Sequence, residues 1–164
     1  MPGYKRVYIQ GGTYFFTVVT ARRAPLFAAP ETRLILRTAI QKVRCRHPFE
    51  IVGMVLLPDH LHALWRLPPD DSDFSIRWRL IKTHMTRYAG QGKRLWQARY
   101  WEHAIRDDHD LSRHLDYLHW NPLKHGLVTR VKDWPWSSFH RYVAAGVYPP
   151  DWCGSRELAD YAFG

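Results

Sequence analysis

The stretch FEIVGMVLLPDHLHALWRL, residues 49–67, decides the fold. Its two apolar runs, residues 49–57 and 60–67, have the length of strands and carry the branched and aromatic residues that strands favour. Pro58 and Asp59 separate the runs, and both residues are common in tight turns. We therefore expect an antiparallel hairpin whose two runs are the central strands of a sheet.

Working outward, strand and helix patterns alternate along the chain. Residues 14–20 and 99–106 are predicted strands, and residues 30–46, 74–89 and 107–120 carry apolar residues at helical spacing. A short helix is expected at 139–145. Gly90 should end the second long helix, and Asn121-Pro122 should end the third, because a residue before proline resists the α region. This order predicts an α+β fold, a ferredoxin-like antiparallel sheet with helices packed mainly on one face.

Length and charge limit the kinds of protein this chain can be. Its 164 residues suffice for one core, so we expect a single domain over 1–164 with a short C-terminal extension from about residue 146. A formal charge of +9 predicts a polyanionic partner. No apolar stretch approaches the roughly 20 residues that cross a bilayer, and no leader opens the chain, so no membrane partner is expected. The isolated Cys45 and Cys153 are expected to be reduced, in an intracellular protein.

His60-Leu61-His62 opens the second strand of the hairpin. Alternate residues of a strand share a face, so both imidazoles should project together while Leu61 points into the opposite layer. Two adjacent imidazoles form a possible pair of metal ligands. The chain has ten histidines, so this spacing alone is weak, and a pair of hydrogen-bonded structural histidines is the alternative.

The third long helix carries a second group of polar residues. Leu111, Leu115 and Leu118 define the stripe that should face the core. Tyr117 and Asn121 are four residues apart and should project together at the shoulder of this stripe, with the side chain three residues before Tyr117, His114, on the same side. A boundary tyrosine and an asparagine at a helix end are the structural alternatives.

The second long helix is basic and aromatic. Its cationic and aromatic side chains alternate, which is typical of surfaces that bind phosphates and unpaired bases, although a solvated basic face has the same pattern. The residues predicted to contact DNA are Arg77, Trp78, Arg79, Lys82 and Arg87.

Four blocks of sequence resemble, in order, the REP-associated tyrosine transposases of bacteria, members of the single-tyrosine HUH transposase superfamily. They are LLPDHLHALW, FSIRWRLIKTHMTRY, YWEHAIRDDHDLSRHLDYLHWNPLKHGLV and DWPWSSFHRYV, and the resemblance spans residues 11–143. It implies that His60 and His62 hold a divalent ion, Mg²⁺ or Mn²⁺, and that Tyr117 is the nucleophile. It also implies Asn121 as a third ligand, and that Lys5 and Arg6 help to read a tetranucleotide beside the DNA hairpin.

The activity implied by the resemblance is metal-dependent cleavage and transfer of single-stranded DNA at palindromic hairpins, through a covalent 5′-phosphotyrosine. Such a protein would be cytoplasmic and associated with the bacterial nucleoid, would work as a monomer or homodimer, and would use no small-molecule substrate. Two alternatives stay open. A basic, aromatic-rich domain can bind hairpin DNA without chemistry. A metal-dependent hydrolase could use His60 and His62 to activate water and leave Tyr117 structural.

Overall fold

The computed structural model describes residues 5–161, and its centre is a four-stranded antiparallel sheet. The strands lie in the order β2-β3-β1-β4, where β1 is Thr13–Val19, β2 is Glu50–Leu56, β3 is His60–Arg66 and β4 is Trp101–Ala104. Strands β2 and β3 form the predicted hairpin, in which Leu56 lies opposite Leu61. The chain order of strands and helices is that of a ferredoxin-like fold, so the predicted α+β class is confirmed.

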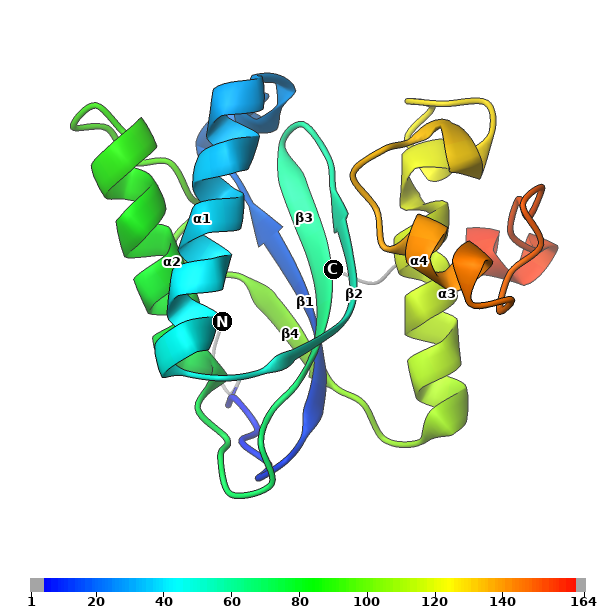
Figure 1. Ribbon diagram of the computed structural model, residues 1–164, viewed down its shortest axis with the longest axis horizontal. Coiled ribbons are helices and arrows are strands. Elements are labelled where there is room, and N and C mark those ends of the chain that lie inside the picture. Colours follow the sequence, from blue (N-terminus) through cyan, green and yellow to red (C-terminus); the bar gives the residue numbers. More distant parts are fainter. Residues whose placement is uncertain (1–4, 162–164) are drawn as a thin grey trace.

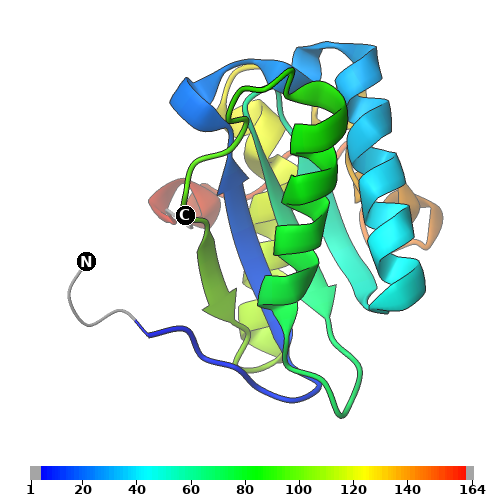
Figure 2. The same cartoon turned by 90° about the vertical axis from the view of Figure 1, so that its left-hand side faces the viewer.

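Helices cover both faces of this sheet, whereas the sequence pattern predicted helices mainly on one face. Helices α1, Pro30–Arg46, and α2, Phe74–Ala89, lie side by side on one face (Figures 1 and 2). Helix α3, Asp108–Lys124, and the short α4, Phe139–Ala144, lie on the other (Figure 1). Four 3₁₀ turns complete the described structure: η1 Ala21–Arg23, η2 Leu26–Ala28, η3 Val131–Asp133 and η4 Arg156–Asp160. Within residues 5–161, no helix is both long and apolar enough to cross a bilayer.

Side chains of β3 alternate between two different environments. Leu61, Ala63 and Trp65 enter the apolar core under α1 and α2, where Trp65 stacks on Trp78 with ring centres 4.2 Å apart. The residues between them face α3, and Leu64 joins the second core there. The strand therefore carries its two histidines to the α3 side of the sheet.

Helix α3 is longer than its sequence pattern predicts. The carboxylate of Asp107 accepts a hydrogen bond from the Asp110 amide at its start. The helix then continues through Pro122 to Lys124, so the predicted end at Asn121-Pro122 is wrong. Pro122 has no N–H to donate to the carbonyl one turn earlier, and the helix ends two residues after it, at Lys124. The amides of His125 and Leu127 satisfy the terminal carbonyls.

The face that α3 turns to the sheet is more polar than expected. Asp110, His114, Tyr117 and Asn121 are buried on it beside Leu118. Leu111 and Leu115, predicted to face the core, are only partly buried. The polar histidine face of β3 accounts for this rotation, because buried polar groups require polar neighbours. Tyr117 is therefore fully inside the layer rather than at its shoulder.

Gly53 allows α3 to approach β2 closely. A β-carbon at this position would lie only 2.7 Å from Cδ1 of Leu115. Gly53 also follows an irregularity in the pairing of β2 with β3. A larger residue here would require the Leu115 side chain to move.

The outer edge of β2 is covered by a later segment of the chain. The Leu56 amide donates to the carbonyl of Trp136 (2.9 Å), and the Ser138 amide donates to the carbonyl of Met54 (2.8 Å). The indole of Trp134 donates to the Leu56 carbonyl at 2.9 Å. The DWPWSS block of the sequence thus pairs with the hairpin and holds α4 against it.

Candidate active site

The two histidines of β3 point at α3 and are fixed by hydrogen bonds. Their rings are 5.0 Å apart and nearly perpendicular. Nδ1 of His60 lies 2.7 Å from the Asp59 carboxylate, and Nδ1 of His62 lies 2.8 Å from the hydroxyl of Thr17. In each ring, Nε2 is therefore the nitrogen left for a ligand, and the partner on Nδ1 sets the orientation of the ring.

Burial controls the protonation of His62, the more deeply buried histidine of the pair. It lowers the pKa of the His62 imidazole well below its usual range, and the neighbouring positive charges of the site lower it further. Burial alone would raise the pKa of Asp59, but hydrogen bonds from His60 and Arg23 hold it below its usual value. His62 is therefore a neutral imidazole, as a metal ligand must be, and Asp59 is an ionised carboxylate that supports the ring of His60.

Tyr117 and Asn121 reach the histidines from α3. The ring of Tyr117 lies 5.7 Å from that of His62. Asn121 is completely buried, and its contact with His62 raises the pKa of that imidazole. Within residues 5–161, however, neither polar atom of the Asn121 amide lies at hydrogen-bond distance and geometry from a partner. A buried amide left in this state is costly unless another ligand completes it.

This donor set fits a divalent metal ion. His60 and His62 offer two ring nitrogens, and Asn121 adds an amide oxygen whose burial without a hydrogen-bond partner calls for a ligand. Imidazole and amide oxygen are both accepted by Mn²⁺, and Mg²⁺ takes the oxygen of the amide together with water and phosphate oxygens. These three residues could therefore hold such an ion, and their assignment as its ligands stays a prediction.

Lys124 and His125 complete the site at the end of α3. The ammonium of Lys124 donates a 2.7 Å hydrogen bond to the Tyr117 hydroxyl. The ring of His125 lies 5.2 Å from that of His60. The sequence patterns did not identify these two residues or Thr17. Tyr117 and Lys124 are seven residues apart, which is two helical turns, so the spacing could have predicted that they share a face. That prediction requires a helix that continues past Pro122.

A second group of potential metal ligands was also missed. His103 on β4 meets Asp110 and His114 on α3, with ligand atoms within 4.8 Å of one another. The rings of the two histidines stack at 4.6 Å. Asp110 and His114 are four residues apart on α3, so helical spacing already pairs them, but only the contact of β4 with the start of α3 adds His103.

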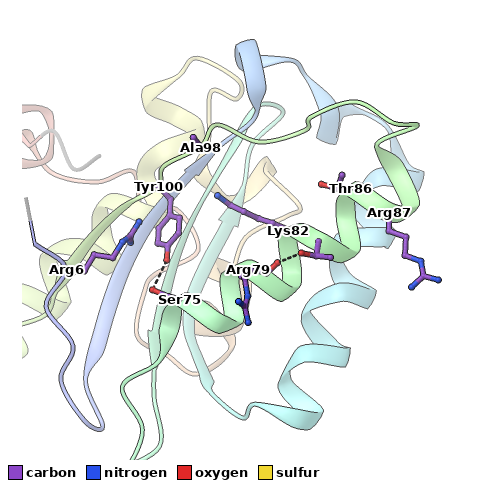
Figure 3. Close-up of a pocket in the computed structure, with 9 residues that line it drawn as sticks. Arg6, Ser75, Arg79, Lys82, Thr86, Arg87, Ala98 and Tyr100 are labelled. Carbon is purple, nitrogen blue, oxygen red and sulfur yellow. Dashed lines mark hydrogen bonds between the residues drawn. The ribbon is translucent and has the colours of Figure 1, made fainter. Parts of the chain in front are cut away.

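A basic pocket lies on the opposite face, between α2 and the residues before β4 (Figure 3). Arg6 lies 4.1 Å over the ring of Tyr100, and the ammonium of Lys82 lies 4.9 Å from that ring. Burial lowers the pKa of Lys82 to about 8, with help from the charge of Arg6. The pocket is lined by Arg6, Ser75, Arg79, Lys82, Thr83, Thr86, Arg87, Ala98 and Tyr100.

Two of the predicted DNA-binding residues lie elsewhere. Arg77 is fully buried and is held by the Asp71 carboxylate and by backbone carbonyls, including that of His47. Trp78 is 1% exposed and packs on Trp65. Both side chains are therefore structural, contrary to the prediction from the sequence. Lys5 is exposed beside Arg6 but does not line the pocket.

Comparison with known proteins gives close relatives. No protein-family model matches the chain. A REP-associated tyrosine transposase of Escherichia coli (strain K12) is 49% identical over 100% of this chain and 97% of its own length. A relative from Haemophilus influenzae, named for the same group, is 43% identical over 96% of this chain and 97% of its own.

Solved structures show the same relationship. The structure of a REP-associated tyrosine transposase bound to a REP hairpin matches this chain with a TM-score of 0.91 at 49% identity. The match covers 100% of this chain and 97% of the other. A structure from Deinococcus radiodurans, with 18% identity and a TM-score of 0.50, covers 67% of this chain and 90% of that one. The second match supports the fold alone.

Proposed function

Because the chain belongs to the REP-associated tyrosine transposases, we propose that it cuts and rejoins single-stranded DNA at hairpins through a covalent bond between Tyr117 and a 5′ phosphate. The observation that carries this proposal is the meeting of the buried Tyr117 and histidine pair with the exposed Lys124 at one end of α3. A nucleophile, a cation on its hydroxyl and a set of metal ligands are the parts that phosphodiester transfer needs.

His60, His62 and Asn121 would hold the ion, Mg²⁺ or Mn²⁺. When bound, such an ion neutralises charge on the phosphate oxygens and helps to align the scissile group. Asp59 and Thr17 keep the two rings in position through their Nδ1 atoms. The protein thus presents ligands that need not reorganise when DNA arrives.

The residues of α3 supply the nucleophile. The Tyr117 oxygen attacks the phosphorus, the bond from phosphorus to the 3′ oxygen breaks, and a proton leaves the phenol while one is gained by the 3′ oxygen. Lys124 already donates to the attacking oxygen, so its charge stabilises the phenolate as it develops. The phosphotyrosine keeps the energy of the broken bond. A second 3′ hydroxyl can therefore reverse the step and join a new strand without ATP.

The basic pocket would bind the DNA backbone. Arg79, Lys82 and Arg87 project from α2, and the N-terminal segment adds Arg6 (Figure 3). Lys5, the residue before Arg6, is exposed. These cations suit phosphates, and the ring of Tyr100 suits a base. Because this pocket and Tyr117 lie on opposite faces of the sheet, a strand that uses both would have to pass around the edge at β4.

A labelled hairpin oligonucleotide with a single-stranded flank tests the proposal. With Mn²⁺, the wild-type protein should form a complex that survives a denaturing gel, attached to the fragment 3′ of the cut. Tyr117→Phe keeps the ring and should bind the same DNA without forming the complex. Cleavage with no complex in the wild type would instead favour hydrolysis by activated water, and binding without cleavage would favour a non-catalytic hairpin-binding protein.

A further inference from the structure

His103, Asp110 and His114 form a compact cluster at the junction of β4 and α3. Nε2 of His103 lies 2.8 Å from Oδ2 of Asp110, and Nδ1 of His114 lies 3.3 Å from Oδ1 of the same carboxylate. Each oxygen of the carboxylate therefore faces one imidazole. From this geometry we propose that the three residues form a second site, for a divalent transition-metal ion such as Zn²⁺ or Co²⁺.

The spacing of the cluster is close to that of a metal centre. Nitrogen and oxygen ligands lie about 2.0–2.2 Å from a tetrahedral zinc ion, which places any two of them roughly 3.3 Å apart. The distances of 2.8 and 3.3 Å from the Asp110 carboxylate to the two histidines differ little from this value. All three ligand atoms lie within 4.8 Å of one another.

The chemistry of the cluster suits a borderline ion rather than Mg²⁺. Two imidazoles and one carboxylate are frequent ligands of zinc and its neighbours, whereas Mg²⁺ prefers oxygen. Burial alone would raise the pKa of Asp110, but hydrogen bonds from His103 and the Arg106 amide lower it to about 2. Burial also lowers the pKa of His114. The cluster thus presents a carboxylate beside a neutral imidazole.

Access to the cluster is open from one side. The His103 side chain is 25% exposed, which leaves room for a water as the fourth ligand. The ion would take the place of the proton shared by His103 and Asp110, and two further contacts must be exchanged. The Arg106 guanidinium lies 3.6 Å from the carboxylate but is 72% exposed, so it can turn into solvent. Nδ1 of His114 also bonds the Asp110 carbonyl at 2.7 Å.

This second site shares no ligand with the proposed catalytic one. The ring of Phe15 lies between them, 5.3 Å from the ring of His62 and 5.0 Å from that of His114. His114 is three residues before Tyr117, so the cluster is about one helical turn away from it. An ion held by residues of β4 and α3 would cross-link the tyrosine helix to the sheet. Its role would be to fix that helix rather than to act on DNA.

The test uses the full chain with His60→Ala and His62→Ala, which remove the imidazoles of the first site. Titration with Co²⁺, followed by calorimetry and visible absorption, should give one bound ion per chain in this background. Bound Co²⁺ should also raise the melting temperature of the protein. Adding His103→Gln should abolish both the binding and this rise. Glutamine can still donate a hydrogen bond to Asp110, so the fold should survive. His109→Ala, an exposed histidine on the same helix, is the matched control and should keep the ion.

Failure of this proposal is distinct from failure of the proposed function. Absence of Co²⁺ binding in the His60→Ala, His62→Ala background would overturn the second site whatever the wild-type chain does with DNA. Equal Co²⁺ binding with and without His103→Gln would also overturn it. Conversely, a chain that forms no covalent complex with DNA can still bind Co²⁺ through His103.

Discussion

The ammonium of Lys124 donates a 2.7 Å hydrogen bond to the hydroxyl of Tyr117, two turns earlier on the same helix. It also lies 4.8 Å from the centre of the tyrosine ring. This pairing depends on the continuation of α3 beyond Pro122, because a helix that ended at Asn121 would not hold Lys124 over the ring. A proline in the last turn is thus compatible with the placement of a cation on the proposed nucleophile.

Replacing Lys124 should slow formation of the covalent complex. A hydrogen bond from a charged donor contributes about 1.5–3 kcal/mol, so Lys124→Met should lower the rate roughly 10- to 100-fold. Single-turnover assays with a labelled hairpin would measure it. Lys124→Arg should recover part of the rate, and Lys132→Ala, which removes an exposed lysine, should have no effect. Wild-type rates in Lys124→Met would remove this residue from the reaction.

Loss of either histidine of β3 should abolish metal-dependent cleavage. His60→Ala and His62→Ala each remove an imidazole, while DNA affinity should change little because it comes mainly from phosphate contacts elsewhere. Cleavage at saturating Mn²⁺ and a filter-binding assay would separate the two properties. Cleavage by either variant at the wild-type rate would show that the ion is held by other residues.

The basic pocket should determine how strongly salt weakens DNA binding. Each phosphate contact contributes a slope of roughly −0.7 in the logarithm of the binding constant against that of salt on single strands. Arg79→Ala and Lys82→Ala should each reduce the slope by about this amount, and Arg37→Ala on α1 should not. Since the pKa of Lys82 is about 8, its contribution should fade as the pH rises above 8. Unchanged slopes in both pocket variants would place the DNA elsewhere.

Arg77 should behave as a structural residue, unlike its neighbours on α2. Its guanidinium binds Asp71 and several backbone carbonyls in a planar arrangement that lysine cannot reproduce. Arg77→Lys should therefore lower the free energy of unfolding by on the order of 3 kcal/mol, measured by urea denaturation. The salt slope of DNA binding should stay as in the wild type. A stable variant with weakened binding would return Arg77 to the DNA contact surface.

Acid should destabilise the fold through buried histidines. Burial lowers the pKa of His119 from 6.5 to about 3. The unfolded chain takes up this proton first as the pH falls, so the stabilisation is complete above about pH 6.5 and is lost progressively towards pH 3. The loss reaches about 1.4 kcal/mol per pH unit for one such group. His119→Gln should flatten the pH dependence of unfolding in this window, and an unchanged curve would assign the acid sensitivity to other groups.

Local patterns predicted the parts of the site that belong to one element. Strand alternation places His60 and His62 together on the α3 side, and helical spacing places Tyr117 beside Asn121. Contacts between elements were not predictable. The burial of Arg77 depends on carbonyls from the end of α1. The cluster of His103, Asp110 and His114 depends on the contact between β4 and α3. A basic, aromatic helix has the same sequence pattern whether its cationic side chains contact solvent, DNA or other parts of the same chain.

The cover that Trp136 and Ser138 provide for β2 also limits how two copies of this chain can associate. A second molecule could extend the sheet only by donating hydrogen bonds to a bare strand edge, and the carbonyls of Met54 and Leu56 are already taken by the chain itself. On the other side, β4 offers only four residues. Strand-to-strand association of two copies is therefore blocked at the β2 edge, and at β4 it could involve only this short strand.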